Sequence, residues 1–251
     1  MNAGALQADG LGKAFGARQV LQDLTLSVKP GTVHAVLGPS GAGKTTLLRI
    51  FNMLEPADSG RVFLDGEEIQ LQAPHARLTE TQHAARLRMA LVPQKPVAFR
   101  TTVFENAAFG LRIRGVGEAE VESKVGAALE RLGLKALADA PARKLSGGET
   151  QRLAFARATV LPLHYLLLDE FTANLDPANV KALEAAVQAS ARDQGLGILF
   201  VTHDMFQARR IADHVTLLVD GTVVESAPKA EFFEAPADPR TRAFVTGEMP
   251  T

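Results

Sequence analysis

Residues 33–45 read VHAVLGPSGAGKT and decide the fold of this 251-residue chain. The first five residues, Val33 to Leu37, form a short apolar run that is typical of a buried strand. They lead directly into residues 38–45, which match the pattern GxxxxGK[ST] in full. Apolar residues recur at helical spacing from Thr45 onward, so the segment predicts a strand, a glycine-rich loop and a helix in succession.

This strand, loop and helix predict a phosphate-binding site. Glycines let the backbone curl so that successive N–H groups point at phosphate oxygens, and the start of the helix adds the positive end of its dipole. Lys44 can reach the β- and γ-phosphates of a nucleotide, and the Thr45 hydroxyl can bind Mg²⁺. The alternative is a glycine-rich turn with an incidental lysine, but the strand and the helix lie where phosphate binding requires them. The residues expected to hold the nucleotide here are Gly38, Pro39, Ser40, Gly41, Ala42, Gly43, Lys44, Thr45 and Thr46.

Composition narrows the class of protein around this loop. Hydrophobic residues make up 46% of the chain and charged residues 22%, which is typical of a globular protein and excludes a disordered or collagen-like chain. The net charge of −1 gives no basic surface for nucleic acid. Because the chain has no cysteine, disulfides, thiolate metal sites and cysteine nucleophiles are excluded. With no visible secretory signal and no run approaching the ~18 apolar residues of a membrane span, we expect an intracellular protein.

Strands that alternate with helices predict an α/β fold with a mainly parallel sheet. A helix-only run over about residues 95–161 interrupts that alternation and reads as an inserted helical subdomain, while residues 70–88 are polar and read as a surface excursion. The expected strands are 3–9, 20–28, 33–37, 61–64, 89–93, 165–168, 197–202 and 215–219. The expected helices are one that begins near residue 45, then 103–113, 121–132, 149–161, 177–194, 205–212, 228–235 and 239–246.

A pair of carboxylates ends the buried strand in LLLDE, residues 166–170. Open α/β sheets bind ligands at the carboxyl ends of their strands. Adjacent strand residues point in opposite directions, so the two side chains can take different roles. Asp169 would hold Mg²⁺, directly or through water, and Glu170 would polarise the attacking water. The alternative is a strand that simply ends in solvated acids, which is uncommon downstream of a matched phosphate loop.

The segment LSGGETQR, residues 145–152, identifies a family. Ser146 and Glu149 form a capping box, which by itself predicts only a well-capped helix start. The two glycines between them expose backbone N–H groups at the positive end of that helix, which suits an anion. This segment closely resembles the signature of ATP-binding cassette (ABC) ATPases. It precedes the carboxylate pair by about twenty residues, as that family requires.

Four further residues match motifs of that family in order along the chain. Gln94 resembles the Q-loop residue that senses metal and water at the γ-phosphate, and His203 resembles the switch histidine that contacts this phosphate. Asp176, in FTANLD, resembles the D-loop residue, which lies where that loop crosses to the other subunit. Phe15 resembles the aromatic residue that stacks on adenine, although a core or surface phenylalanine is the alternative.

The resemblance covers nearly the whole chain and implies an ATPase with one ABC domain, residues 1–251, of the RecA-like P-loop NTPase class. Residues 1–94 and 162–251 would form the nucleotide-binding core, with an N-terminal antiparallel β subdomain. Two copies would bind ATP and Mg²⁺ between them, most simply as a homodimer. The signature segment of each copy would close over the phosphate loop of the other. The implied site residues are Lys44, Gln94, Glu170 and His203 for catalysis, Thr45, Gln94 and Asp169 for Mg²⁺, and Phe15, the phosphate loop, Asp176, Ser146, Gly147 and Gly148 for ATP.

An ATPase without a membrane span implies separate permease subunits, which places the chain at the cytoplasmic face of the inner (plasma) membrane. The short length resembles the short importer type of ATPase. Residues 94–115, together with the C-terminal residues 239–250, most resemble ATPases of oxyanion importers, tungstate first, phosphate or molybdate second, with polar amino-acid importers third. A solute-binding protein would be an indirect partner. Within this stretch Val97, Phe99, Val103 and Phe104 either line a groove for the permease or form the core of the helical subdomain.

The alternative function is that of an ABC ATPase that acts on nucleic acid or the ribosome. Such proteins usually carry two cassettes or a long coiled coil between their motifs. Only about 50 residues separate Gln94 from the LSGGE segment here, too few for a coiled coil. The near-zero net charge also disfavours nucleic acid as a partner.

Overall fold

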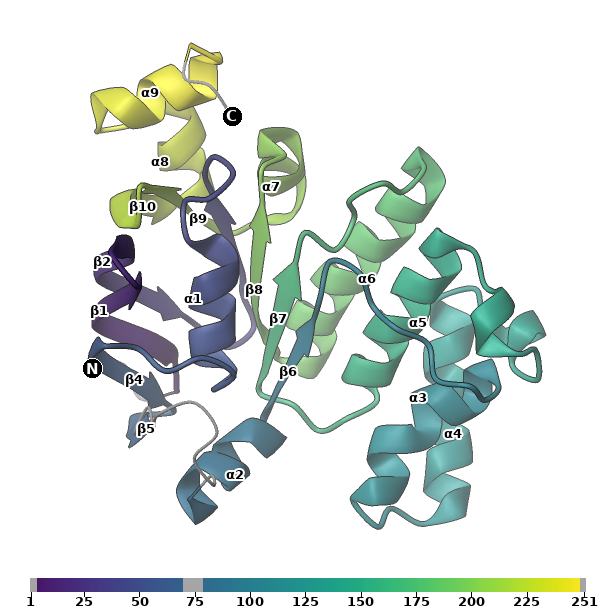
Figure 1. Ribbon diagram of the computed structural model, residues 1–251. Coiled ribbons are helices and arrows are strands. Elements are labelled where there is room, and N and C mark those ends of the chain that lie inside the picture. The colour runs from purple at the N-terminus through teal and green to yellow at the C-terminus, as the bar shows by residue number, and fades with distance from the viewer. Residues whose placement is uncertain (1–3, 70–78, 249–251) are drawn as a thin grey trace.

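The computed structural model describes residues 4–69 and 79–248, and its strands form two sheets (Figure 1). The strands are β1 (Leu6–Phe15), β2 (Arg18–Val28), β3 (Val33–Leu37), β4 (Ser59–Leu64), β5 (Glu67–Ile69), β6 (Met89–Val92), β7 (Tyr165–Asp169), β8 (Gly197–Thr202), β9 (His214–Val219) and β10 (Thr222–Pro228). The larger sheet has the order β10-β9-β3-β8-β7-β6 and is parallel except for β10 at its edge. The smaller sheet has the order β2-β1-β4-β5 and is antiparallel throughout. The predicted α/β architecture, with a mainly parallel sheet and an antiparallel β sheet built largely from the N-terminal strands, is confirmed.

Several helices begin where a side chain caps free backbone N–H groups. The Asp176 carboxylate accepts hydrogen bonds from the N–H groups of Ala178 and Asn179, both at 3.0 Å, and Pro177 occupies the first helical position, where no N–H is needed. Asp204 caps the helix after β8 in the same way. The helices are α1 (Lys44–Phe51), α2 (Glu80–Leu87), α3 (Val103–Ile113), α4 (Glu118–Arg131), α5 (Gly147–Thr159), α6 (Pro177–Gln194), α7 (Met205–Ile211), α8 (Lys229–Glu234) and α9 (Pro239–Thr246).

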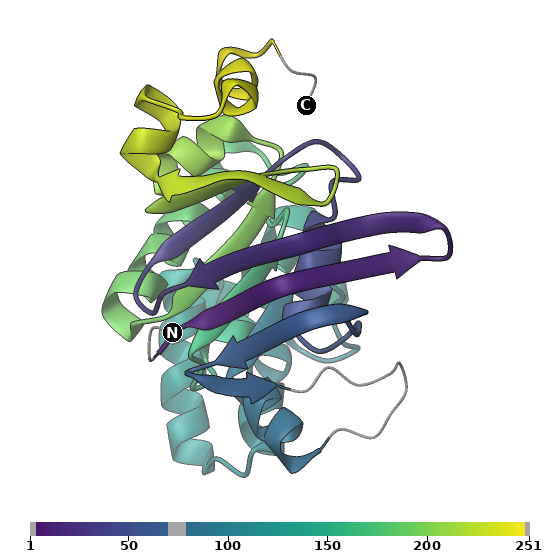
Figure 2. The ribbon, with the colours of Figure 1, turned by 90° about the vertical axis from the view of Figure 1, so that its left-hand side faces the viewer.

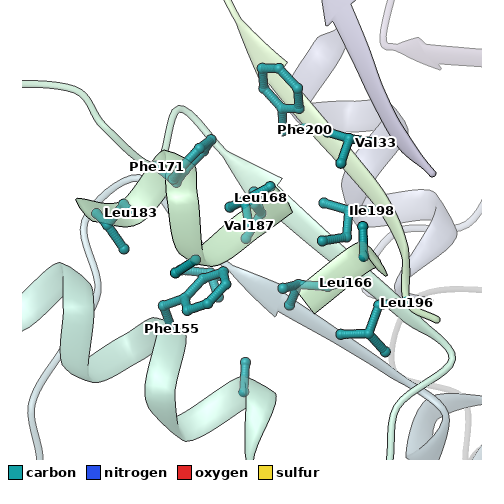
Figure 3. Close-up of a cluster of buried hydrophobic side chains, with 14 of the residues drawn as sticks. Val33, Phe155, Leu166, Leu168, Phe171, Leu183, Val187, Leu196, Ile198 and Phe200 are labelled. Carbon is teal, nitrogen blue, oxygen red and sulfur yellow. The ribbon is translucent and has the colours of Figure 1, made fainter. Parts of the chain in front are cut away.

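Both faces of the parallel sheet are buried, so its strands carry two cores by alternation. Along β7, Leu166 and Leu168 belong to the core shared with α5 and α6, which Figure 3 shows in close-up. Tyr165 and Leu167 belong to the other core, which surrounds α1 between the two sheets. Figure 2 shows the antiparallel sheet as a separate layer over the parallel one. The phosphate-loop helix α1 is thus held from both sides.

Helices α3, α4 and α5 lie together on one side of the parallel sheet, beyond β6 and β7 (Figure 1). Their shared core includes Val103, Leu111, Val125 and Leu153. This grouping is what an inserted helical subdomain over residues 95–161 requires, and we retain those bounds as a proposal.

The surface excursion expected over residues 70–88 contains a helix that the sequence did not predict. Residues 80–87 form α2, which begins at a capping box between Thr79 and Gln82. This helix was missed because it is short and polar and buries few side chains, so no apolar periodicity marks it. Residues 70–78 lie outside the described residues.

The edge strands also differ from the prediction. Strand β1 runs over Leu6–Phe15 rather than 3–9, with register shifts after Ala8 that disturb its alternation. Strands β5 and β10 were not predicted. Each is an edge strand with mostly exposed or half-buried residues, so neither leaves a strong apolar pattern in the sequence.

In the part of the chain that the structure describes, no helix combines the length and the apolar character that a membrane crossing needs.

Replacing Phe200 by alanine should lower the free energy of unfolding by about 3–5 kcal/mol. Phe200 is fully buried and packs edge-on against Phe171 with ring centroids 5.8 Å apart, so truncation leaves a cavity between α6 and the sheet. Phe206→Ala is the matched control, because this ring is 65% exposed, and it should change stability by less than about 0.5 kcal/mol. Urea unfolding followed by circular dichroism measures both, and equal losses for the two variants would contradict this account of the core.

Candidate functional site

The order of the larger sheet brings together the segments that follow four strands. Strands β3, β8, β7 and β6 are parallel neighbours, so their carboxyl ends share one edge of the sheet. The phosphate loop follows β3, His203 follows β8, Glu170 follows β7, and Gln94 follows β6. A pocket of about 470 Å³ opens at this edge. Its lining residues are Phe15, Arg18, Val20, Ser40, Gly41, Gly43, Lys44, Thr45, Thr46, Gln94, Asp169 and Glu170.

Most of the predicted site residues therefore meet in one pocket, and two of its lining residues were not predicted. Arg18 and Val20 come from the start of β2, next to the hairpin turn that follows Phe15. Arg18 pairs directly with Phe15 across that hairpin, and its Nη2 would lie 3.3 Å from a Cβ atom at Gly41. A two-residue turn after the aromatic residue was the available signal, because it returns the chain to the same end of the ladder.

The phosphate loop has its shape because two of its glycines have no room for a side chain. A Cβ atom on Gly38 would lie 2.0 Å from the carbonyl oxygen of Leu218. Gly43 has φ 101°, and a Cβ atom there would lie 2.7 Å from the carbonyl oxygen of Val20. Both positions accept glycine alone without a shift of the backbone.

Lys44 fills the centre of this loop. Its Nζ donates to the carbonyl oxygens of Gly38, at 2.6 Å, and Pro39, at 2.9 Å. Burial lowers the pKa of Lys44, and the nearby carboxylates of Glu170 and Asp169 oppose that effect. A buried cation held only by neutral carbonyl groups gains strongly from an anion, so the loop is suited to phosphate.

Asp169 and Thr45 place oxygen donors beside the loop. The Thr45 hydroxyl donates to Asp169 Oδ1 at 3.2 Å. Burial raises the pKa of Asp169, although the Thr45 hydrogen bond opposes this. A hydroxyl and one carboxylate match the oxygen ligands of Mg²⁺, which keeps several waters and phosphate oxygens. No cluster of three or more His, Cys, Asp or Glu side chains occurs among residues 4–69 and 79–248, so the described chain offers a partial ligand set that a bound nucleotide would complete.

Both oxygens of Glu170 have hydrogen-bond partners, of which Gln94 lines the pocket and His203 does not. Gln94 Nε2 donates to Oε2 at 2.8 Å, and His203 Nδ1 lies 3.2 Å from Oε1. Glu170 follows the last residue of β7 and has φ 42°, a conformation that costs free energy for a residue with a side chain. The turn explains why Asp169 and Glu170 line the same pocket, where simple strand alternation predicts opposite directions.

The signature segment forms the predicted capping box at the start of α5. The Ser146 N–H donates to Glu149 Oε2 at 2.8 Å, and the Glu149 N–H donates to Ser146 Oγ at 3.3 Å. The hydrogen bond from the Ser146 N–H lowers the pKa of Glu149 below its ordinary value, so this carboxylate stays ionised. Figure 1 shows α5 and α1 on opposite sides of strands β6 to β8. Ser146, Gly147, Gly148 and Asp176 are not among the residues that line the pocket.

Comparison with known proteins agrees with this site. Residues 21–173 match the family model described as ABC transporter. The chain is 43% identical to the phosphate import ATP-binding protein PstB 2 of Natronomonas pharaonis, over 97% of this chain and 87% of that protein. It is 42% identical to a probable anion import ATP-binding protein of Haloferax volcanii, with the same two shares covered. The structure of cbiO1 from Clostridium perfringens, part of the ABC transporter complex cbiONQ, matches with a TM-score of 0.82 and 28% identity, over 97% of this chain and 98% of that one.

A phosphate loop that faces a carboxylate pair across the edge of a parallel sheet defines an ATPase of the P-loop class. Within that class, the chain belongs to the ABC transporter family. It is an ATP-binding and ATP-hydrolysing member, as the sequence predicts.

Replacing Gly38 by alanine should weaken ATP binding at least about tenfold, because the new methyl group meets the Leu218 carbonyl and must displace the loop. Gly126→Ala is the control, since this glycine lies inside α4 with open space around its Cβ position. It should keep full ATP affinity and raise the free energy of unfolding by up to about 1 kcal/mol. A fluorescent ATP analogue measures binding, and wild-type affinity in Gly38→Ala would refute the steric argument.

Proposed function

We propose that this chain is the ATP-hydrolysing subunit of an ABC importer and that two copies close around ATP to drive the import of a small solute. One observation carries the proposal: the signature turn at residues 146–148 is not part of the pocket that Lys44 and Glu170 form in the same chain. The start of α5 carries the positive end of the helix dipole, which suits an anion, and Ser146 and Gly147 are exposed there, so the phosphate must come from elsewhere. A second copy arranged head to tail supplies it.

Three residues of the pocket would bind different parts of ATP. Lys44 exchanges its two carbonyl partners for phosphate oxygens, which replaces neutral acceptors by charged ones. Arg18, near Gly41, adds a second cation at the pocket wall. The Phe15 ring is half-exposed at the pocket with Lys13 Nζ 5.1 Å from its centroid, so one apolar surface is available for adenine to stack on.

Hydrolysis requires a water in line with the γ-phosphate and a base to accept its proton. Glu170 is the base, and each of its carboxylate oxygens keeps a second lone pair that can accept a hydrogen bond from that water. His203 Nδ1 and Gln94 Nε2 hold the carboxylate in place. Thr45 and Asp169 would hold Mg²⁺, and Gln94, which lines the same pocket, would add its amide oxygen. The ion would supply positive charge against the β- and γ-phosphates.

The groove for the permease is a separate surface on the helical side. Val103 is fully buried and Phe104 packs against the same core, so these two residues belong to the subdomain itself. Val97 is 72% and Phe99 39% exposed. The core alternative therefore applies to Val103 and Phe104, and the groove alternative stays a proposal for Val97 and Phe99. A pocket of about 430 Å³ adjoins Phe99, and its lining residues are Phe99, Thr101, Glu105, Phe109, Arg112 and Ile113.

We propose that a segment of an integral-membrane permease docks in this groove and holds the chain at the cytoplasmic face of the inner membrane. An exposed apolar patch rimmed by polar residues is typical of a protein interaction site. Phe109 is 48% and Ile113 70% exposed, which is unusual for large apolar side chains of one helix.

For the solute we propose an oxyanion, with tungstate as the specific expectation from the sequence. The import of phosphate and of an anion by the two relatives named above supports the class of solute. The solute does not touch this subunit, so the choice among oxyanions rests on a solute-binding protein. Calorimetric titration of that protein with tungstate, molybdate and phosphate tests the choice. Stimulation of the ATPase by nucleic acid, and not by a permease, would instead favour the alternative function.

Glu170→Gln should retain ATP binding and lose turnover by about 10²–10⁴-fold, because the amide keeps the hydrogen-bonding shape and cannot accept the proton. With ATP bound and not consumed, the closed dimer should accumulate. Gel filtration with and without ATP measures the dimer, and phosphate release measures turnover.

Lys44→Ala is the companion variant, and it should show neither ATP binding nor a dimer, since the loop loses its central cation. Wild-type turnover in Glu170→Gln would remove Glu170 from its role as base. A Glu170→Gln chain that binds ATP as a monomer would overturn the dimer.

Ile113→Glu should abolish co-purification with the permease subunits, because it places a charge inside an apolar contact. The ATPase activity of the isolated chain should stay the same, since Ile113 is not part of the nucleotide pocket. Leu54→Glu, after α1, is the control, because Leu54 is a half-exposed apolar residue that lines neither this groove nor the nucleotide pocket. Equal co-purification of the two variants would refute the docking site.

A further inference from the structure

Asn179 lies in the first turn of α6 and connects two segments that are distant in the sequence. Its Nδ2 donates to Asp176 Oδ2, and its Oδ1 accepts from Arg152 Nη1 on α5. Asp176 is the residue that resembles the D-loop, and α5 is the helix that the signature segment begins. One amide side chain thus joins the two segments that the proposed dimer presents to its partner.

The amide group of Asn179 fits between these two neighbours because it both donates and accepts hydrogen bonds. An ionised carboxylate only accepts hydrogen bonds, and a guanidinium only donates them, so the bridge needs a donor on one side and an acceptor on the other. Hydrogen bonds from Asn179, first from its backbone N–H and then from its side chain, lower the pKa of Asp176 and keep it ionised. Arg152 Nε is buried without a hydrogen-bond partner within the described residues, which leaves Asn179 as a main anchor of that guanidinium.

Asn179 also packs against the signature turn itself. A Cβ atom on Gly148 would lie 2.6 Å from both Cγ and Nδ2 of Asn179. Gly148 is therefore a glycine for two reasons, the approach of a phosphate and the approach of this amide.

The polar contacts continue from Asn179 to the signature serine. Arg152 attracts the ionised Glu149, and that carboxylate accepts hydrogen bonds from both the N–H and the hydroxyl of Ser146. A single chain of charged and hydrogen-bonded groups thus runs from Asp176 through Asn179 to Ser146. Networks of this kind act as a unit when every member is held.

We propose that Asn179 is a positioning residue that locks the signature turn to the D-loop, so that both segments meet the second copy as one rigid surface. This inference rests on the proposed dimer and deepens it. Asn179 is not among the residues that line the pocket with Lys44, so it acts on the nucleotide held by the partner copy and not on its own.

Asn179→Ala tests this by separating ATP binding from turnover. Binding of a fluorescent ATP analogue to the isolated chain should stay within twofold of wild type, while kcat for ATP hydrolysis falls about tenfold. In a Glu170→Gln background, the ATP concentration that gives half-maximal dimer should rise about fivefold or more. Asn179→Asp should behave like Asn179→Ala. It keeps an acceptor for Arg152, but it places a second carboxylate against Asp176, and the two negative charges repel each other.

Lys181→Ala is the matched control, an exposed side chain on the following turn of α6. It should leave ATP binding, kcat and dimer formation unchanged. Thermal unfolding shows whether Asn179→Ala loses folded protein. A loss of folded protein lowers ATP binding and kcat together, whereas a loss of positioning lowers kcat alone.

Wild-type kcat and an unchanged dimer titration in Asn179→Ala would overturn the inference. Equal losses of ATP binding and kcat would also overturn it, because they indicate a structural role. If the parent Glu170→Gln chain itself forms no dimer with ATP, the proposed function fails first and the positioning role falls with it.

Discussion

The structure depends on the register of four parallel strands. Leu37 of β3 pairs with Thr202 of β8, and Asp169 of β7 pairs with Val201. This register ends the strands at one level, so the phosphate loop, His203 and Glu170 leave the sheet side by side. A shift of one residue would turn each strand over and exchange its two cores. Because both faces of the sheet are buried, the packing against α1 and α6 fixes the register, and the register fixes the site.

The same burial sets the electrostatics of the pocket. Lys44 and Asp169 are partly removed from water, which lowers the pKa of the first and raises that of the second. Each charge is therefore only partly compensated within the chain. ATP brings phosphate oxygens to Lys44, and the proposed Mg²⁺ would bring positive charge to Asp169, so the two ligands together would compensate both groups.

The sequence alone predicted those parts of the site whose conformation depends on residues close together in the chain. GPSGAGKT marks a loop in which two glycines have no room for a side chain, and Ser146 with Glu149 marks a helix start, so both were found. The orientation of Glu170 was not predictable, because it depends on a single positive φ angle. Arg18 was missed because it enters the pocket through tertiary pairing with Phe15, and α2 was missed because polar residues leave no periodic signal. The sequence could not show which of residues 97–104 are buried and which are exposed, because this depends on how α3 packs.

The groove, the pocket and the signature helix are mechanically connected through the stretch that follows β6. Gln94 begins this stretch and holds Glu170. Three residues later, the carbonyl oxygen of Val97 accepts a hydrogen bond from Arg157 Nη1 at 3.0 Å, and the Arg157 guanidinium lies 4.7 Å from the Phe99 ring. Arg157 belongs to α5, so Phe99, at the proposed docking groove, contacts the signature helix through Arg157 and lies in the same stretch as Gln94, which donates to Glu170. With a permease docked at Phe99 as proposed, this stretch would be the contiguous path between the groove and the pocket.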